Sequence, residues 1–318
     1  HRDGSGICHC SHLRPLLNTR PGYYTMGYGK GSGLRHFQAD SHLIWWLHEK
    51  GIPFDIITDK ELHEEGHAAI QGYKIVTTGS HPEYHTSNTL DALLAFRNQG
   101  GNFMYLGGNG FYWRVAVHEC ERGIIEIRRG EGGIRAWAAE PGEYYNAFDG
   151  NYGGLWRRGG RPPQQLAGVG FTSQGQFEGT FYRRTEDSYA SDMAWIFQGI
   201  SGEILGDFGF SGGGAAGYEL DRADVRLGTP LNVRVLAQSE QHSDHFVLVP
   251  EELLTHLTTL PLLPMDDLIR ADMIYFEVPG GGKVFSVGSI TFCGSLPWNG
   301  GNNDISQLVE NVLRGFLK

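Results

Sequence analysis

The sequence has 318 residues, a formal net charge of -10, 40% hydrophobic residues and 19% charged residues. These proportions are typical of a globular protein and exclude a disordered chain, and the length allows one large domain or two. The acidic balance excludes a nucleic-acid partner, and the apolar runs are too short to span a membrane.

The first third of the chain alternates between two kinds of pattern. Apolar spacing predicts helices over 38–50, 60–71 and 87–98, and short β-like runs predict strands over 54–58, 73–78 and 102–106. Strands that alternate with helices are typical of a parallel sheet with helices on both faces. We therefore predict a three-layer parallel α/β sheet.

The pattern changes near residue 111. Short β-like runs lie between turn residues over 124–128, 181–184, 231–237 and 246–249. The α/β pattern then returns, with strands predicted over 273–278 and 284–292 and an amphipathic helix over 304–317. We predict one domain with its α/β core at 1–110 and 266–318 and a long β-rich insertion at 111–265.

Polar side chains gather directly after the strand predicted at 73–78. The stretch His81-Pro82-Glu83-Tyr84 follows Gly79, at the edge of the sheet where open α/β proteins bind ligands. In an extended turn, His81 and Glu83 point the same way, and Pro82 restricts the backbone between them. Carboxylate and imidazole suit iron, manganese or zinc. A surface salt-bridge turn is the alternative, but the placement favours a functional site.

Two further polar residues belong to the same prediction. Asn109 follows the strand at 102–106, so it should reach the same edge of the sheet, although an asparagine in a left-handed turn is common. Glu219 comes out of a run of glycines and alanines that would let the backbone press close to another element. A flexible loop with a solvated Glu219 is the alternative.

Other motifs carry weaker signals. His63-Glu-Glu-Gly-His67 matches a zinc-hydrolase pattern, but Gly66 weakens the helix that the pattern needs by about 1 kcal/mol. Cys8-His9-Cys10 has the wrong spacing for a zinc knuckle and is typical of a loop. The glycine-rich run 27–33 lacks the spacing of a phosphate-binding loop.

The remaining indications concern location and support. Two more polar groups are expected, at most, to support the residues of a site without taking part in its chemistry: 242–245 (His-Ser-Asp-His) and 251–252 (Glu-Glu). Four scattered cysteines and the lack of a signal-peptide pattern predict a cytoplasmic protein. A first residue His1 rather than Met is typical of a piece of a longer protein.

Longer motifs resemble one known family. Three of the shared motifs lie in the middle of the chain: Gly79-Ser-His-Pro-Glu-Tyr, Tyr105-Leu-Gly-Gly-Asn-Gly-Phe-Tyr-Trp and Gly212-Gly-Gly-Ala-Ala-Gly-Tyr-Glu. Asp3-Gly-Ser-Gly-Ile-Cys and Val287-Gly-Ser-Ile extend the likeness almost end to end. The chain thus resembles the catalytic region of the large (β) subunit of the N,N-dimethylformamidase family.

The resemblance implies a fold similar to class I glutamine-amidotransferase-like proteins. It implies an amidohydrolase that cleaves a small N-substituted formamide to formate and an amine at a mononuclear iron, held by two tyrosines and one glutamate. The glutamate corresponds to Glu83, and the tyrosines are expected upstream of His1, so Tyr84 is a neighbour rather than a ligand. His81, Asn109 and Glu219 match the family's catalytic polar residues.

The resemblance also implies a small (α) subunit as partner and a homo-oligomer. Two alternatives from other classes stay open at this stage. One is a non-catalytic amidotransferase-like domain that binds a sugar or another small molecule, because the sequence has no cysteine at the strand-to-helix turn. The other is a zinc peptidase built on His63 and His67.

Overall fold

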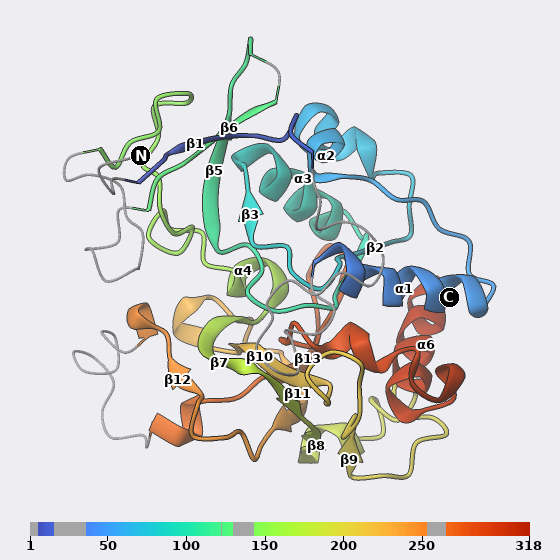
Figure 1. Cartoon of the computed structure of the whole chain (residues 1–318). Coiled ribbons are helices and arrows are strands. Elements are labelled where there is room, and N and C mark those ends of the chain that lie inside the picture. Colours follow the sequence, from blue (N-terminus) through green and yellow to red (C-terminus); the bar gives the residue numbers. More distant parts are fainter. Residues whose placement is uncertain (1–5, 16–35, 122, 130–142, 253–264) are drawn as a thin grey trace.

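The computed structural model describes residues 6–15, 36–121, 123–129, 143–252 and 265–318. Its centre is a seven-stranded sheet (Figure 1). In spatial order the strands are β2 (Ile75–Thr77), β4 (Asn102–Tyr105), β14 (Lys283–Ser286), β13 (Asp272–Glu277), β11 (Arg234–Ser239), β8 (Tyr182–Arg184) and β9 (Ile204–Leu205). β2, β4 and β14 run parallel, while every later neighbour pairs antiparallel. The sheet is therefore mixed, with parallel strands at one side.

Helices cover both faces of this sheet. Successive residues of a strand point to opposite faces, and here both faces are apolar: Phe103 joins one core cluster and Met104 the other. The Met104 side packs against α1 (Phe37–Glu49) and α6 (Asp304–Leu317). The Phe103 side packs against α3 (Ser87–Asn98). This gives three layers around the parallel strands.

The predicted helices form largely where the apolar spacing places them. α3 and α6 occupy the predicted residues, and each begins at a polar cap: the Thr86 side chain accepts from Thr89 N, and the Asn303 side chain accepts from Ser306 N. Shorter helices are α2 (Asp59–Glu65) and α4 (Gln164–Ala167), and the 3-10 turns are η2 (Gly66–Ala69), η3 (Glu186–Tyr189), η4 (Val225–Leu227), η5 (Met265–Leu268), η6 (Phe292–Ser295) and η7 (Trp298–Gly301).

Several predicted elements differ from the structure. Residues 54–58 form no strand, and Ile56 is 66% exposed because no neighbouring strand covers it. The helix predicted at 60–71 breaks at Gly66, whose φ of 61° ends α2. The strand predicted from Leu231 begins at Arg234, and β14 ends at Ser286.

Two smaller sheets flank the central one. The first has the order β1 (His9–Ser11), β6 (Ile124–Ile127), β5 (Trp113–Val117) and β3 (Tyr84–His85), so Cys8-His9-Cys10 leads into a strand rather than lying in a loop. The second has the order β10 (Ala216–Arg222), β7 (Gly170–Thr180) and β12 (Val247–Leu248). In Figure 1 the first sheet lies in the upper left part of the view.

The segment 111–265 contributes to more than the smaller sheets. β8, β9 and β11 all come from it, and β11 pairs with β13 of the predicted core. The predicted core and insertion thus share one sheet, and the boundaries at 111 and 265 stay a prediction. Within the residues that the structure describes, no helix is both long and apolar enough to cross a membrane.

Candidate functional site

Four predicted residues meet beyond the carboxyl ends of β2 and β4. His81 Nε2 lies 3.2 Å from Glu83 Oε2 and 3.2 Å from Glu219 Oε2. Asn109 Nδ2 donates to Glu219 Oε2 at 3.0 Å and lies 3.2 Å from His81 Nε2. We call these four residues the His81 cluster. They come from three separate segments, of which strand ends predict the first two: the turn after β2, the loop after β4, and β10.

The turn that carries His81 and Glu83 is held from two directions. On one side, Asp40 of α1 accepts from Ser80 N at 2.6 Å and from Ser80 Oγ at 2.8 Å. On the other side, Phe111 N donates to Pro82 O at 2.7 Å, and the carbonyl oxygen of Glu83 accepts from the two backbone N–H groups that follow Phe111. These bonds fix the backbone on both sides of His81.

The loop after β4 brings Asn109 to the cluster in a strained conformation. Asn109 has φ 50° and Phe111 has φ 55°, in the left-handed region that costs non-glycine residues about 1–2 kcal/mol each. Gly108 lets this loop pass close to β10, because a Cβ added there would lie 2.7 Å from Glu219 O. Strain of this kind is concentrated at functional sites.

β10 presents Glu219 through an irregularity in its pairing. The register with β7 shifts between Gly217 and Glu219, and Tyr218 between them has φ 62°. Gly217 packs so closely on β7 that an added Cβ would overlap the backbone oxygen of Glu178. This confirms the expected close backbone approach, but Glu219 lies in a strand and is 6% exposed rather than solvated in a loop.

The electrostatics of the cluster favour a charged histidine. Burial lowers the pKa of His81, but hydrogen bonds and charge interactions with Glu219 and Glu83 outweigh it and raise this pKa to about 10. The side chains of His81, Glu83 and Glu219 are only 9%, 14% and 8% exposed, so solvent screens these interactions weakly. The two carboxylates thus favour the protonated form of His81.

The donor set of the cluster suits part of a metal site. Asn109 Oδ1 is buried and has no hydrogen-bond partner within the described residues, and carboxylate and imidazole are ligands that iron accepts. Over the same residues, no group of three or more His, Cys, Asp and Glu side chains is arranged to hold a metal ion. The carboxylate of Glu83 is the kind of oxygen ligand that iron accepts.

Tyr84 lies beside the cluster rather than in it. Its hydroxyl accepts from Arg129 Nη2 at 2.9 Å, and its pKa is raised to about 12 by burial and by the charge of Glu83. A phenol with this pKa stays protonated at neutral pH. Its place next to Glu83 agrees with its expected part as a neighbour.

The other predicted polar groups lie in separate networks. His242 contacts Ser239, and His245 contacts Glu178. Glu251 accepts from Tyr112 OH at 2.7 Å, and Glu252 pairs with two arginines. These contacts tie loops and strands together, and none of them reaches the His81 cluster.

The zinc-peptidase alternative is wrong. Gly66 ends α2, so His63 lies in α2 while His67 lies in the separate turn η2. His63 Nδ1 instead contacts Thr86 Oγ1 at 2.9 Å. The two imidazoles do not share a helix face, which the zinc motif requires. The glycine-rich run 27–33 lies outside the described residues.

Sequence reasoning missed three residues that build the site: Asp40, Tyr105 and Asp221. Asp221 accepts from Asn109 N at 2.7 Å and from Tyr105 OH at 2.7 Å. Its pKa is raised to about 7, mainly by burial. The strand period gave no usable signal for Asp221, because the pairing of β10 is irregular between Leu220 and Asp221.

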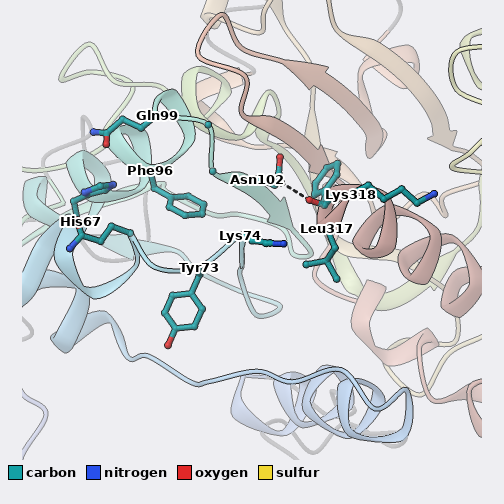
Figure 2. A pocket seen from close by; sticks show the side chains of 12 residues that line it. His67, Tyr73, Lys74, Phe96, Gln99, Asn102, Leu317 and Lys318 are labelled. Carbon is teal, nitrogen blue, oxygen red and sulfur yellow. Dashed lines mark hydrogen bonds between the residues drawn. The ribbon is translucent and has the colours of Figure 1, made fainter.

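Two hollows differ in their relation to the cluster. A cavity of about 710 Å³ reaches His81, with Pro82, Leu93 and Phe111 among its mainly apolar lining. A second hollow of about 630 Å³, shown in Figure 2, lies at the amino ends of β2 and β4, where Asn102 donates to Phe316 O at 2.9 Å. Because open α/β sheets bind ligands at the carboxyl ends of their strands, the first cavity is the better candidate.

Comparisons with known proteins agree with the resemblance in the sequence. The family model described as N,N-dimethylformamidase beta subunit-like, C-terminal, matches residues 1–305. A relative from Paracoccus aminophilus, named N,N-dimethylformamidase beta subunit, is 40% identical over 323 residues, which cover 100% of this chain and 41% of the relative. A relative of the same name from an Alcaligenes species is 39% identical over the same extent.

This chain spans about two fifths of the length of these curated relatives. The match covers nearly the whole chain and includes all four residues of the His81 cluster. The chain belongs to the N,N-dimethylformamidase beta subunit-like, C-terminal, family.

Proposed function

We propose that this chain is the catalytic region of an amide hydrolase that cleaves a small N-substituted formamide, such as N,N-dimethylformamide, to formate and an amine. The observation that carries the proposal is the convergence of Glu83 and Glu219 on His81 Nε2, at 3.2 Å each. Two relatives named for dimethylformamide cleavage support the choice of substrate. The apolar cavity beside His81 suits the alkyl groups of such an amide.

The proposed cofactor is a mononuclear iron, to which Glu83 would contribute its carboxylate. When bound, iron supplies Lewis-acid chemistry that polarises the amide carbonyl or activates water. The further tyrosine ligands that the family resemblance implies are expected upstream of His1. The unpartnered Asn109 Oδ1 and the carboxylates beside His81 support a cation at this position.

The proposed roles of the remaining residues follow from their positions. Glu219 would accept a proton from the attacking water, a contribution of roughly 10²–10⁴-fold. Asn109 would donate its amide N–H to the oxygen that becomes negatively charged, which in other enzymes is worth about 3–4 kcal/mol. His81 Nε2 lies 3.2 Å from Glu219 Oε2, so His81 would orient Glu219 and supply the proton that the departing amine needs.

Assembly and location complete the proposal. The relatives are named as a beta subunit, so we expect a small alpha subunit as partner, together with a homo-oligomer. Helices on both faces of the parallel strands support the expected likeness to class I glutamine-amidotransferase-like folds. We expect the protein to act in the cytoplasm, because its four cysteines are scattered along the sequence.

The proposal is tested on the complete protein with Glu83→Gln, Glu219→Gln and the control Glu64→Gln. Glu83→Gln should lower both iron content and formate release, because it removes a charged ligand. Glu219→Gln should keep the iron and lower kcat by roughly 10²–10⁴-fold. Glu64 has a 56% exposed side chain and pairs with Lys60 on the surface, so Glu64→Gln should match the wild type.

The measurements are iron by elemental analysis and formate released from a panel of N-substituted formamides. Wild-type turnover by an iron-free Glu83→Gln protein would contradict the proposal. So would a wild-type protein that binds saccharides tightly and releases no formate from any amide of the panel.

A further inference from the structure

The loop after β4 holds Asn109 in a backbone conformation that needs support. With φ 50° at Asn109 and φ 55° at Phe111, two side-chain-bearing residues within three positions adopt the left-handed region. Asparagine tolerates this region, but a bulky residue such as Phe111 keeps it only where the surrounding structure holds it. Some neighbouring group must therefore hold this loop.

The support comes from Tyr105 and Asp221. One carboxylate oxygen of Asp221 accepts from Asn109 N at 2.7 Å, and the other accepts from Tyr105 OH at 2.7 Å. The Tyr105 oxygen in turn accepts from Gly110 N at 2.7 Å. Two successive backbone N–H groups of the loop are thus bound by this Tyr105–Asp221 pair, and both of its side chains are completely buried.

The fixed backbone decides where the Asn109 side chain points. Its Nδ2 lies 3.0 Å from Glu219 Oε2 and 3.2 Å from His81 Nε2. The hydrogen bonds of the Tyr105–Asp221 pair reach the loop backbone, and the Asn109 amide continues from there to His81 and Glu219. The carboxylate of Asp221 also interacts electrostatically with Glu219 and His81.

Core packing by itself does not explain a carboxylate at this position. Asp221 is 0% exposed, and burial raises its pKa to about 7, which shows how poorly this place solvates the charge. Apolar residues of similar volume would fill the same space at a lower free-energy cost. The carboxylate is explained by its two acceptor oxygens, which bind the loop and Tyr105 at the same time.

We propose that Asp221 and Tyr105 are positioning residues that hold the Asn109 amide against His81 and Glu219. The inference rests on the proposed function for its effect on turnover. It concerns two residues that lie outside the His81 cluster. Its structural part, the placement of Asn109, is independent of what the enzyme cleaves.

The test uses Tyr105→Phe and Asp221→Asn in the complete protein, with Asp272→Asn as the matched control. Asp272 is also 0% exposed, and its carboxylate accepts from Ala223 N at 2.9 Å, Gln238 Nε2 at 2.8 Å and Arg270 Nε at 2.8 Å, none of which belongs to the Asn109 loop. Both test variants should lower kcat by roughly ten- to a hundred-fold, because a misplaced oxyanion donor loses most of its effect. Iron content should stay at the wild-type level, and Asp272→Asn should keep the wild-type kcat.

A double-mutant cycle separates positioning from general destabilisation. If the pair acts through Asn109, Asn109→Ala combined with Tyr105→Phe should lose no more kcat than Asn109→Ala alone. If the fold-loss of kcat in the double variant equals the product of the fold-losses in the two single variants, the inference is overturned. If Tyr105→Phe does not fold, Asp221→Asn carries the cycle, because it keeps the side-chain volume and one acceptor oxygen.

Crystal structures of the same variants give a readout that needs no assay. The Asn109 amide should move away from His81 Nε2 in Tyr105→Phe and in Asp221→Asn. An unmoved Asn109 in both variants would overturn the inference. If the wild type hydrolyses no formamide, the proposed function is contradicted. The crystal structures of the variants then still test whether Asp221 and Tyr105 position the Asn109 amide.

Discussion

Glu219 and Asp221 lie two positions apart on β10, and the functions proposed for them differ because their neighbours differ. Glu219 contacts the side chains of His81 and Asn109, whereas Asp221 contacts a backbone N–H and a phenol. The sequence indicated Glu219 through the small residues that precede it. It could not indicate Asp221, because the partner Asn109 lies 112 positions away along the chain.

The buried histidine His42 leads to a prediction about pH and stability. Burial lowers the pKa of His42 to about 4, while an unfolded histidine titrates near 6.5. Between these values the unfolded state binds a proton that the folded state does not. The free energy of unfolding should therefore fall as the pH drops from 6.5 to 4.

Replacing His42 by Gln should reduce the fall in the free energy of unfolding between pH 7 and pH 5 by on the order of 1 kcal/mol. Urea unfolding at pH 7, 6 and 5 measures this fall. His48→Gln is the control, because the His48 side chain is 81% exposed. Some slope should remain in His42→Gln, since burial also lowers the pKa of His242 to about 4. Equal pH slopes for wild type and His42→Gln would contradict the prediction.

At the scale of elements, three connections build the site: the turn after β2, the loop after β4 and the irregular strand β10. The sequence predicted the first two from strand ends, which parallel pairing of β2 with β4 brings to one edge. It did not predict that β10 would join them. β10 pairs with β7 in a separate sheet, and that pairing is a long-range contact with no local signal.

The close packing of β10 on β7 predicts a strong effect of Gly217→Ala. The added methyl group would overlap the backbone oxygen of Glu178, so one of the two strands must shift. Overpacking of this kind costs about 1–3 kcal/mol, and here it also displaces the neighbouring Glu219. We expect a lower Tm together with a lower kcat.

Gly72→Ala is the control for this prediction, because no atom lies within 4 Å of a Cβ added at Gly72. It should change the free energy of unfolding by less than about 0.5 kcal/mol. Thermal unfolding and formate release measure both variants. If Gly217→Ala has the same Tm and kcat as Gly72→Ala, the prediction is wrong, because β10 and β7 then accommodate the added methyl group at little cost.

At the scale of the whole molecule, the first long helix and the last one share a core cluster. Trp46 of α1 is 0% exposed, and its Nε1 donates to Ser306 Oγ of α6 at 2.7 Å. This bond joins residues 260 positions apart. It helps to hold α1, and α1 carries Asp40, which binds the turn before His81.

Trp46→Phe tests this connection, with the neighbouring Trp45→Phe as the control. Loss of the indole leaves Ser306 buried without its donor and opens a small cavity, which together should cost about 1–3 kcal/mol. Trp45 is 37% exposed, so its replacement should cost less than about 0.5 kcal/mol. Chemical unfolding measures both variants, and equal midpoints for the two would contradict this account.

The sequence alone determined the parts of this protein that depend on local pattern. Apolar spacing placed α3 and α6, strand ends placed His81, Glu83 and Asn109 at one edge, and motifs placed the chain in its family. The predicted strand at 54–58 was wrong: its apolar residues match a strand pattern, but no strand among the described residues pairs with it.

The tertiary structure alone decided how the site is assembled. The antiparallel half of the central sheet, the register shift at Glu219 and the hold of Asp221 on the Asn109 loop all join segments that are distant in sequence. The physical reason is that such pairings depend on which surfaces meet in space, and periodicity reports only which face of an element is apolar.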